Sequence, residues 1–244
     1  MKKILSLFLS FALLLTLFCI PAYADKKPSS LNEVEISKEN AYYDESLGAY
    51  VVSFTLNSDN TLNYLTKSEV NALNTEGNTL NSSNTNISEL PNTDEDSLSI
   101  LADYYEYYKF VKTSGPVKYV GTRRKVSADF EAPPAGGSVS KSVSFTISAT
   151  YSAGVTTSAQ KSAIQANAGF SWNVSATAST TYTANLSAGQ TGYLAFTPYY
   201  NKVSGNLQLY SNWDGLISST SATGYSVMKT YDGEPDGLYQ FILY

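Results

Sequence analysis

The feature that most constrains the fold is a strict alternation of apolar and small polar residues between positions 138 and 156. One parity holds apolar residues and a single lysine, and the other holds only serine, threonine and one glycine. Successive side chains of a β-strand point to opposite faces of the sheet. The pattern therefore predicts a strand with one apolar face and one face lined with hydroxyl groups.

A second run, 170–186, repeats the alternation, with aromatic and aliphatic residues and one threonine, Thr180, on one parity and serine, threonine and asparagine on the other. The segment between the two runs, 157–167, alternates less clearly and is expected to contain a turn of helix. Together the runs predict a long antiparallel hairpin in an all-β protein, built as an antiparallel β-sandwich or an elongated sheet.

The polar face of this hairpin leaves three interpretations open. Between positions 132 and 201 the only charged residues are Lys141 and Lys161, whereas exposed strands of soluble proteins usually carry many charges. Such a face fits an ordinary two-layer β domain, a platform for a polar ligand, or the water-filled side of a hairpin that enters a membrane. In the last case the following residues would face lipid: Val143, Phe145, Ile147, Phe170, Trp172 and Val174.

Two resemblances accompany this pattern. The hairpin, followed by a glycine-containing turn and an aromatic strand (LSAGQTGYLAFTPYYNKVSGNL), resembles the insertion region of aerolysin-like and epsilon-toxin-like pore-forming proteins over residues 139–207. The same stretch, continuing through SNWDG at 211–215 to a tyrosine-rich end, also resembles small exported β-proteins of Gram-positive bacteria with no assigned function. The first resemblance implies membrane insertion, and the second implies no particular activity.

The N-terminus has the three parts of a secretory signal peptide. Lys2 and Lys3 give it a positive start, residues 4–20 are apolar or small, and the sequence AYA at 22–24 has the small residues that a signal peptidase recognises. An uncleaved anchor is the alternative, although the apolar run has about the minimum length for a spanning helix. We expect cleavage after Ala24 and secretion.

The residue types needed for most catalytic chemistry are missing. The chain contains no histidine, and cleavage would remove its only cysteine, Cys19. This excludes a histidine base, a thiolate nucleophile and a Cys/His zinc site from the expected mature chain. Ser158 and Lys161 match a serine–lysine spacing, but the K-T-G element that accompanies it is absent. We expect no enzyme activity, no catalytic residue, no bound metal and no cofactor.

Residues 25–97 are acidic and rich in asparagine, and we expect them to form a partly flexible N-terminal region. The alternation at 49–56 predicts one strand in this region, and a short helix is expected at about 66–73. The remainder, 74–97, has little hydrophobic periodicity and is expected to be a loop.

Residues 98–244 are expected to form the antiparallel β domain. Two strands joined by a turn at 114–116 are predicted within 98–130. The last two strands, 225–231 and 238–244, are expected to form a hairpin that ties the C-terminus into the sheet.

Two groups of side chains are candidates for contact with a partner. Tyrosines that lie on a surface combine apolar area with a hydroxyl that forms hydrogen bonds. The only arginines of the chain are adjacent and could hold an anionic group. The candidate contact residues are Tyr104, Tyr105, Tyr107, Tyr108, Arg123 and Arg124.

The expected function follows from these observations. We expect an exported, non-catalytic β-sheet protein that binds an extracellular ligand or surface whose identity is unknown, with a β-hairpin pore-forming protein as the alternative. A membrane is a partner only under that alternative. The net charge of −5 argues against nucleic acid.

Overall fold

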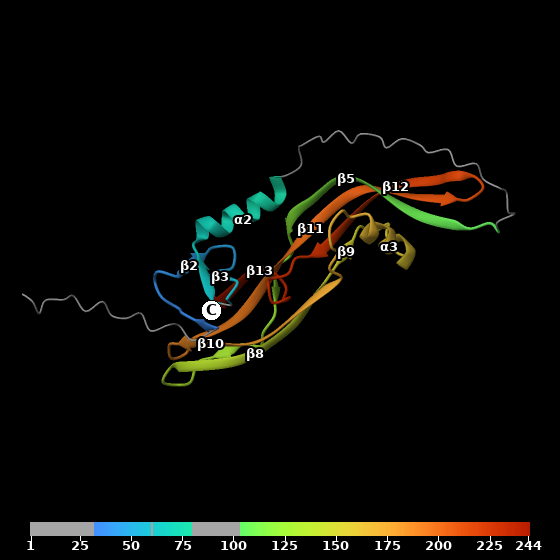
Figure 1. Cartoon of the computed structure of the whole chain (residues 1–244). Helices are drawn as coiled ribbons and strands as arrows, with labels where there is room; N and C mark the ends of the chain where they lie inside the picture. Colours follow the sequence, from blue (N-terminus) through green and yellow to red (C-terminus); the bar gives the residue numbers. More distant parts are fainter. Residues whose placement is uncertain (1–31, 60, 80–102) are drawn as a thin grey trace, which may run out of the picture. The chain divides into compact units, whose positions relative to one another are not determined.

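The computed structural model describes residues 32–59, 61–79 and 103–244, and the side chains of residues 76–79 are not described. The expected signal peptide, 1–24, and most of the expected loop, 74–97, lie outside the described residues. The described part is all-β, with two sheets and two helices, α2 (Lys67–Thr79) and α3 (Ser158–Ala166) (Figure 1). The all-β fold class predicted from the sequence is confirmed.

The larger sheet is arranged around one long strand, β11 (Thr191–Ser211). Other strands pair antiparallel with both edges of β11. Along one edge lie β13 (Gly237–Leu243) and then β12 (Gly215–Val227), and along the other lie β7 (Phe130–Glu131), β6 (Arg124–Lys125) and β5 (Glu106–Val120). A single 21-residue strand therefore provides hydrogen-bond partners for five others.

The outer strands of this sheet come partly from the N-terminal region. They are β3 (Ala49–Leu56), which pairs with β13; β2 (Ala41–Asp44) and β4 (Leu62–Leu65), which pair with β3; and β9 (Thr150–Tyr151), which pairs with β12. The strand expected at 49–56 is confirmed. The helix expected at about 66–73 is also confirmed, and α2 continues beyond it to Thr79.

The smaller sheet contains the Ser/Thr-alternating strands. Its order is β1 (Glu33–Val34), β10 (Ser175–Leu186) and β8 (Gly137–Ser148), and β8 and β10 pair antiparallel from Gly137 opposite Leu186 to Ser148 opposite Ser175. The paired, two-faced hairpin is therefore confirmed over twelve residues of each strand.

The apolar face of the hairpin packs on the larger sheet. Val143 and Ile147 of β8 and Tyr182 of β10 are buried, at 2%, 1% and 1% exposure. They belong to one core with aromatic residues of the larger sheet, which include Phe54, Phe196, Tyr239 and Phe241. Burial of such side chains contributes roughly 1.5–3 kcal/mol each to folding, so this layer is a main source of stability.

The connection between β8 and β10 folds back on the larger sheet instead of extending the hairpin. It contains β9 and α3. Thr157 caps the N-terminus of α3: its hydroxyl accepts a hydrogen bond from the Gln160 amide, and the Gln160 side chain accepts one from the Thr157 amide. Ile164 of α3 is buried in a second core with residues of β5, β11 and β12. The helical turn expected within 157–167 is confirmed.

This excursion corrects the expectation for the second alternating run. Residues 170–174 are not part of a strand, and Val174, which the pattern predicts to be buried, is 58% exposed. The physical reason is that Asn173 forms hydrogen bonds with Ser226 and Val227 of β12, so the chain crosses to the other sheet before it enters β10.

The turn predicted at 114–116 is also wrong, because β5 runs through it as one strand. The pairing with β11 shifts register here, between Lys202 and Gly205, which marks a bulge. Gly115 has a φ of +94°, and a Cβ on it would lie 2.4 Å from the Lys202 carbonyl oxygen. Glycine and proline at this point therefore form a bulge against a long partner strand, where sequence alone predicts a turn.

The expected C-terminal hairpin is wrong in its pairing. β12 and β13 do not pair with each other but follow one another along the same edge of β11, running in the same direction. The turn-forming residues 232–236 make a small loop, closed by a bridge between Lys229 and Pro235, after which the chain resumes its direction. The C-terminal strand is nevertheless tied into the sheet, between β11 and β3.

The tyrosine hydroxyls allow a test of this packing. The Tyr64 hydroxyl accepts a hydrogen bond from the Glu35 amide at 2.8 Å and donates one to the Glu33 carbonyl at 3.1 Å. The buried Tyr199 hydroxyl has no hydrogen-bond partner among the described residues, and burial raises the pKa of Tyr199 to about 12. We expect Tyr64→Phe to lower the free energy of unfolding by about 1–3 kcal/mol and Tyr199→Phe to leave it unchanged or higher.

Urea denaturation of both variants checks this expectation. Each substitution removes one oxygen from a tyrosine that is at least partly buried, so the two variants are matched controls for one another. An equal loss of stability in both would contradict the assignment of hydrogen bonds.

Candidate functional site

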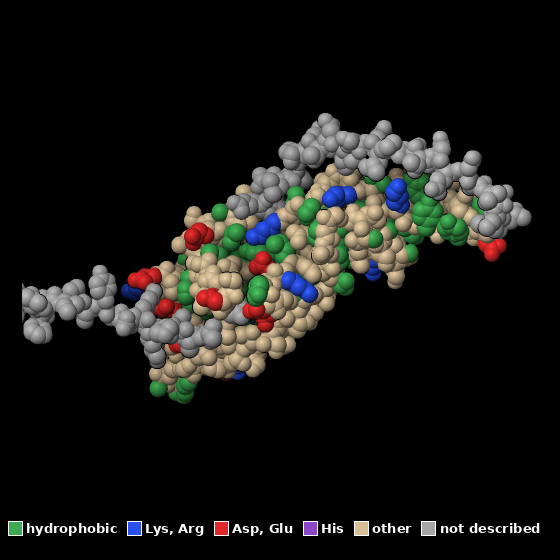
Figure 2. Space-filling model, viewed as in Figure 1, with side chains coloured by type: hydrophobic (Ala, Val, Ile, Leu, Met, Phe, Trp, Pro, Cys, Tyr) green, Lys and Arg blue, Asp and Glu red, His purple; other side chains and the backbone are tan. Residues whose placement is uncertain are grey.

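Exposed aromatic and aliphatic side chains gather where the outer ends of β5, β11 and β12 meet, and we call this surface the aromatic tip. Its members are Tyr104 (47% exposed), Tyr105 (56%), Tyr107 (44%), Trp213 (68%), Leu216 (50%), Ile217 (45%) and the half-buried Tyr210. Figure 2 shows hydrophobic side chains gathered at the end of the molecule where Figure 1 places β5 and β12. Contiguous apolar surface of this kind commonly marks an interaction site.

Strand register brings these residues together. Tyr210 of β11 lies between Tyr107 of β5 and Leu216 of β12. The rings of Tyr107 and Tyr210 stack at 5.5 Å between centroids, and Tyr104 packs edge-on against Trp213 at 5.5 Å. The rings therefore support one another in two groups at the same end of the sheet, one with Tyr104 and Trp213 and one with Tyr107 and Tyr210.

The turn between β11 and β12 fixes this arrangement. The Ser211 hydroxyl accepts a hydrogen bond from the Asp214 amide at 2.7 Å, and Gly215 has a φ of +71°, which suits glycine. The Asn212 side chain accepts a hydrogen bond from the Tyr105 amide at 3.0 Å and donates one to the Asp103 carbonyl at 3.0 Å. Asn212 thus ties the segment that carries Tyr104 and Tyr105 to the turn that carries Trp213.

Acidic side chains lie beside Tyr104 of the tip. The Tyr104 hydroxyl donates a hydrogen bond to Glu106 at 2.6 Å, and this bond raises the pKa of Tyr104. Glu106 and Asp214 are the carboxylates adjoining the rings. The tip is therefore aromatic with an acidic border.

The four candidate tyrosines separate into two groups. Tyr104, Tyr105 and Tyr107 are exposed on the tip, whereas Tyr108 is partly buried against the core beneath α3. Sequence reasoning missed Trp213, Leu216 and Ile217 as contact residues. The signal that could have found them is the short SNWDG turn, which places a tryptophan at a strand end.

The two candidate arginines are bound to different strands. Arg123 Nη1 donates a hydrogen bond to Gln240 of β13 at 3.3 Å, and Arg124 Nη2 donates one to the Thr146 carbonyl of β8 at 2.7 Å. Both also line an open pocket of about 510 Å³ beside Tyr119, Tyr200 and Tyr225. Arg124 therefore attaches the hairpin to the larger sheet. Arg123 also lines a second, polar pocket beside Gln240, which Arg124 does not line.

The candidate membrane-facing residues lie in three environments. Val143 and Ile147 are buried, while Phe145, Phe170 and Trp172 are half-buried and Val174 is exposed. On the opposite face of the hairpin, hydrogen bonds join Ser140 to Thr183 at 2.7 Å, Ser142 to Thr181 at 3.1 Å and Thr146 to Thr177 at 2.8 Å. The exposed face is thus a ladder of hydroxyl groups that bond across the strands.

The described residues contain no group of three or more histidine, cysteine, aspartate or glutamate side chains that could hold a metal ion. Neither described helix is long and apolar enough to cross a membrane.

Comparison of the whole chain with known protein families, with curated proteins and with solved structures gives no match.

Proposed function

We propose that the protein is exported and acts without catalysis, by binding a membrane surface outside the cell through the aromatic tip. The observation that carries this proposal is the clustering of Trp213, Leu216 and Ile217, each at least 45% exposed, with three exposed tyrosines at one end of the sheet. Exposing so much apolar surface to water is unfavourable unless a partner covers it.

The composition of the tip favours a lipid interface over a protein groove. Tryptophan and tyrosine rings are enriched at the boundary between headgroups and acyl chains, where one side of the ring is apolar and the other is hydrated. Leu216 and Ile217 would add aliphatic area that enters the acyl region. Because Glu106 and Asp214 border the tip, we expect it to prefer zwitterionic lipids to anionic ones.

The tip can be tested by flotation with phosphatidylcholine vesicles. We expect Trp213→Ser to weaken binding about tenfold, because burial of a large aromatic side chain contributes roughly 1.5–3 kcal/mol. The emission of Trp213 should also shift to shorter wavelength on binding, and Trp172→Phe leaves Trp213 as the only tryptophan for this measurement.

The matched control is Tyr231→Ser, which removes an aromatic ring that is 90% exposed and lies outside the tip. This variant should bind vesicles like the unsubstituted protein. Equal binding by the Trp213→Ser and Tyr231→Ser variants would contradict a role for the tip, and no flotation of the unsubstituted protein would remove the membrane as its partner.

Pore formation by the β8–β10 hairpin is the second candidate function, and the faces of the hairpin favour it specifically. One face carries hydroxyl groups and the other is apolar apart from Lys141 and Thr180, as in strands that line a water-filled membrane pore. Each strand has twelve residues, and a membrane-spanning strand needs about 9–11. The resemblance of residues 139–207 to aerolysin-like proteins supports the same proposal.

Labelled cysteines distinguish insertion from surface binding. The exported form expected to begin at Asp25 has no cysteine, so Ile147→Cys and Ser144→Cys each create a single labelling site. If the hairpin inserts, a dye at position 147 should become quenchable by lipid-borne quenchers, while a dye at position 144 stays quenchable from water. Vesicle binding through the tip with no change at position 147 would reject insertion.

A further inference from the structure

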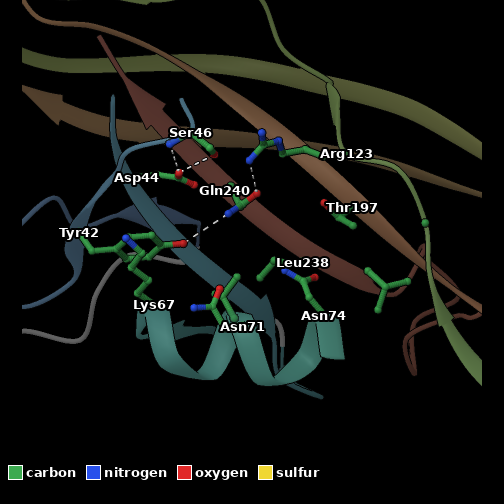
Figure 3. A pocket seen from close by; sticks show the side chains of 13 residues that line it. Tyr42, Asp44, Ser46, Lys67, Asn71, Asn74, Arg123, Thr197, Leu238 and Gln240 are labelled. Carbon is green, nitrogen blue, oxygen red and sulfur yellow. Dashed lines mark hydrogen bonds between the residues drawn. The ribbon is translucent and has the colours of Figure 1, made fainter. Parts of the chain in front are cut away.

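A polar pocket lies between α2 and the larger sheet, far along β11 from the aromatic tip. Its volume is about 380 Å³, and Figure 3 shows the side chains of α2, β2 and β13 that surround it. We call it the α2 pocket. The polar side chains that line it include Tyr42, Lys67, Asn71, Asn74, Arg123 and Gln240.

The floor of the α2 pocket is a buried hydrogen-bond network. Gln240 is only 4% exposed, and its amide nitrogen donates a hydrogen bond to the buried Ser53 hydroxyl at 3.2 Å. The Ser53 hydroxyl is also joined to the Tyr42 hydroxyl at 2.8 Å. The Gln240 amide oxygen accepts the bond from Arg123 at 3.3 Å. A buried amide held in one orientation therefore holds the guanidinium at the edge of the pocket (Figure 3).

The pocket holds two cations, Lys67 and Arg123, and one carboxylate, Asp44. Among the described residues neither Lys67 nor Arg123 has a carboxylate within ion-pair distance, and Lys67 donates a hydrogen bond only to the Tyr43 carbonyl, at 3.2 Å. The one carboxylate that lines the pocket, Asp44, already accepts hydrogen bonds from the Ser46 amide at 2.9 Å and the Ser46 hydroxyl at 2.7 Å. Arg123 has five N–H donors and uses one of them on Gln240. Hydrogen bonds from Ser46 and the charge of Arg123 lower the pKa of Asp44, so Arg123 is partly balanced by this carboxylate. Lys67 and Arg123 together still outnumber Asp44, which leaves a positive charge in the pocket for an anion.

The other groups of the pocket suit hydroxyl groups. Asn71 and Asn74 lie three residues apart on α2, so they share the helix face that carries Lys67 and faces the strands (Figure 3). Each carboxamide can both donate to and accept from a hydroxyl, as can the Thr197 side chain. The volume is near the small end of the range for ligand pockets, roughly 300–1,000 Å³, which suits one small ring.

We propose that the α2 pocket binds a single carboxylated sugar unit, such as a uronic or a sialic acid. The sugar carboxylate would accept hydrogen bonds from Arg123 and be attracted by the positive charge of Lys67. The ring hydroxyls would form hydrogen bonds with Asn71, Asn74 and Thr197. The bidentate geometry of a guanidinium matches a carboxylate, which is why Arg123 is assigned the central role. This site is independent of the aromatic tip and of the proposed membrane function.

Saturation-transfer NMR of the purified protein tests the proposal with glucuronate, N-acetylneuraminate, glucose and acetate as probes. Glucuronate differs from glucose only by its carboxylate, and acetate has the carboxylate without the ring. We expect saturation transfer to at least one of the two acidic sugars. Comparison of glucuronate with N-acetylneuraminate shows whether the pocket prefers a uronic or a sialic acid. Glucose and acetate should bind at least about tenfold more weakly.

Substitutions locate the site. Arg123→Gln should weaken binding of the acidic sugar about tenfold or more, and Arg123→Lys should weaken it less, because it keeps the charge and loses the fork. Asn71→Ala, on an exposed position of α2, should reduce the preference for the sugar acid over acetate while the charge is kept. Lys109→Gln, which removes an exposed cation of β5 outside the pocket, should have no effect.

Each other outcome would overturn the proposal. Equal binding of glucose and glucuronate would show that charge is not recognised, and equal binding of acetate would show that only an adventitious anion is held. No saturation of either acidic sugar, or an equal loss in the Lys109→Gln variant, would reject the α2 pocket as the site. Thermal unfolding of each variant separates loss of the site from loss of the fold.

Discussion

The hydrogen-bond ladder along both edges of β11 is the interaction on which the rest of the structure depends. Because five strands pair with this one strand, its length sets the extent of the larger sheet. The two proposed sites lie on different stretches of the same ladder: Tyr210 belongs to the aromatic tip and Thr197 lines the α2 pocket. At about 3.3 Å per residue, roughly 40 Å of strand separates them, so one ligand does not bridge both.

The elements that could be predicted from the sequence are those with strong local patterns. The alternation of residues 138–156 and 170–186 predicted both strands of the hairpin, but the strands are shorter, since β8 ends at Ser148 and β10 begins at Ser175. The strand at 49–56 and the helix after Thr66 were predicted for the same reason. In the hairpin strands the apolar side chains that repeat along the strand are those that meet the core, so the local period carries the information. In β3 the period predicted the strand but not its burial, since Tyr50 is exposed and Val51 and Ser53 are buried.

The remaining errors arose where long-range pairing overrides local signals. Gly115 and Pro116 are turn formers, but β11 offers a continuous partner and converts the expected turn into a bulge. Residues 232–236 form a loop between β12 and β13, and both of these strands pair with β11. No local pattern distinguishes such a loop from the turn of a hairpin. Trp213 joins Tyr104 only through the same pairing, and the α2 pocket is assembled from Lys67, Arg123 and Gln240, which are far apart in sequence.

The two proposed membrane functions make different demands on this fold. Binding through the aromatic tip uses side chains that are already exposed, so it needs no change in the core. Insertion of the hairpin would expose Val143, Ile147 and Tyr182, and a bilayer could replace the apolar environment that the larger sheet gives them. Backbone pairing opposes this change little within the described residues, because only the two-residue β1 pairs with the outer edge of β10.

The connection between the hairpin strands is also attached to the larger sheet. It is attached to β12 by the β9 pairing and by Asn173, and Trp172 lies so close to Gly224 that a Cβ there would be 2.7 Å from its ring. Gly224 thus provides the space that lets Trp172 and Ile164 pack on the sheet. An inserting hairpin would have to lose these contacts before β8 and β10 could lengthen, so the second core opposes insertion in addition to the first.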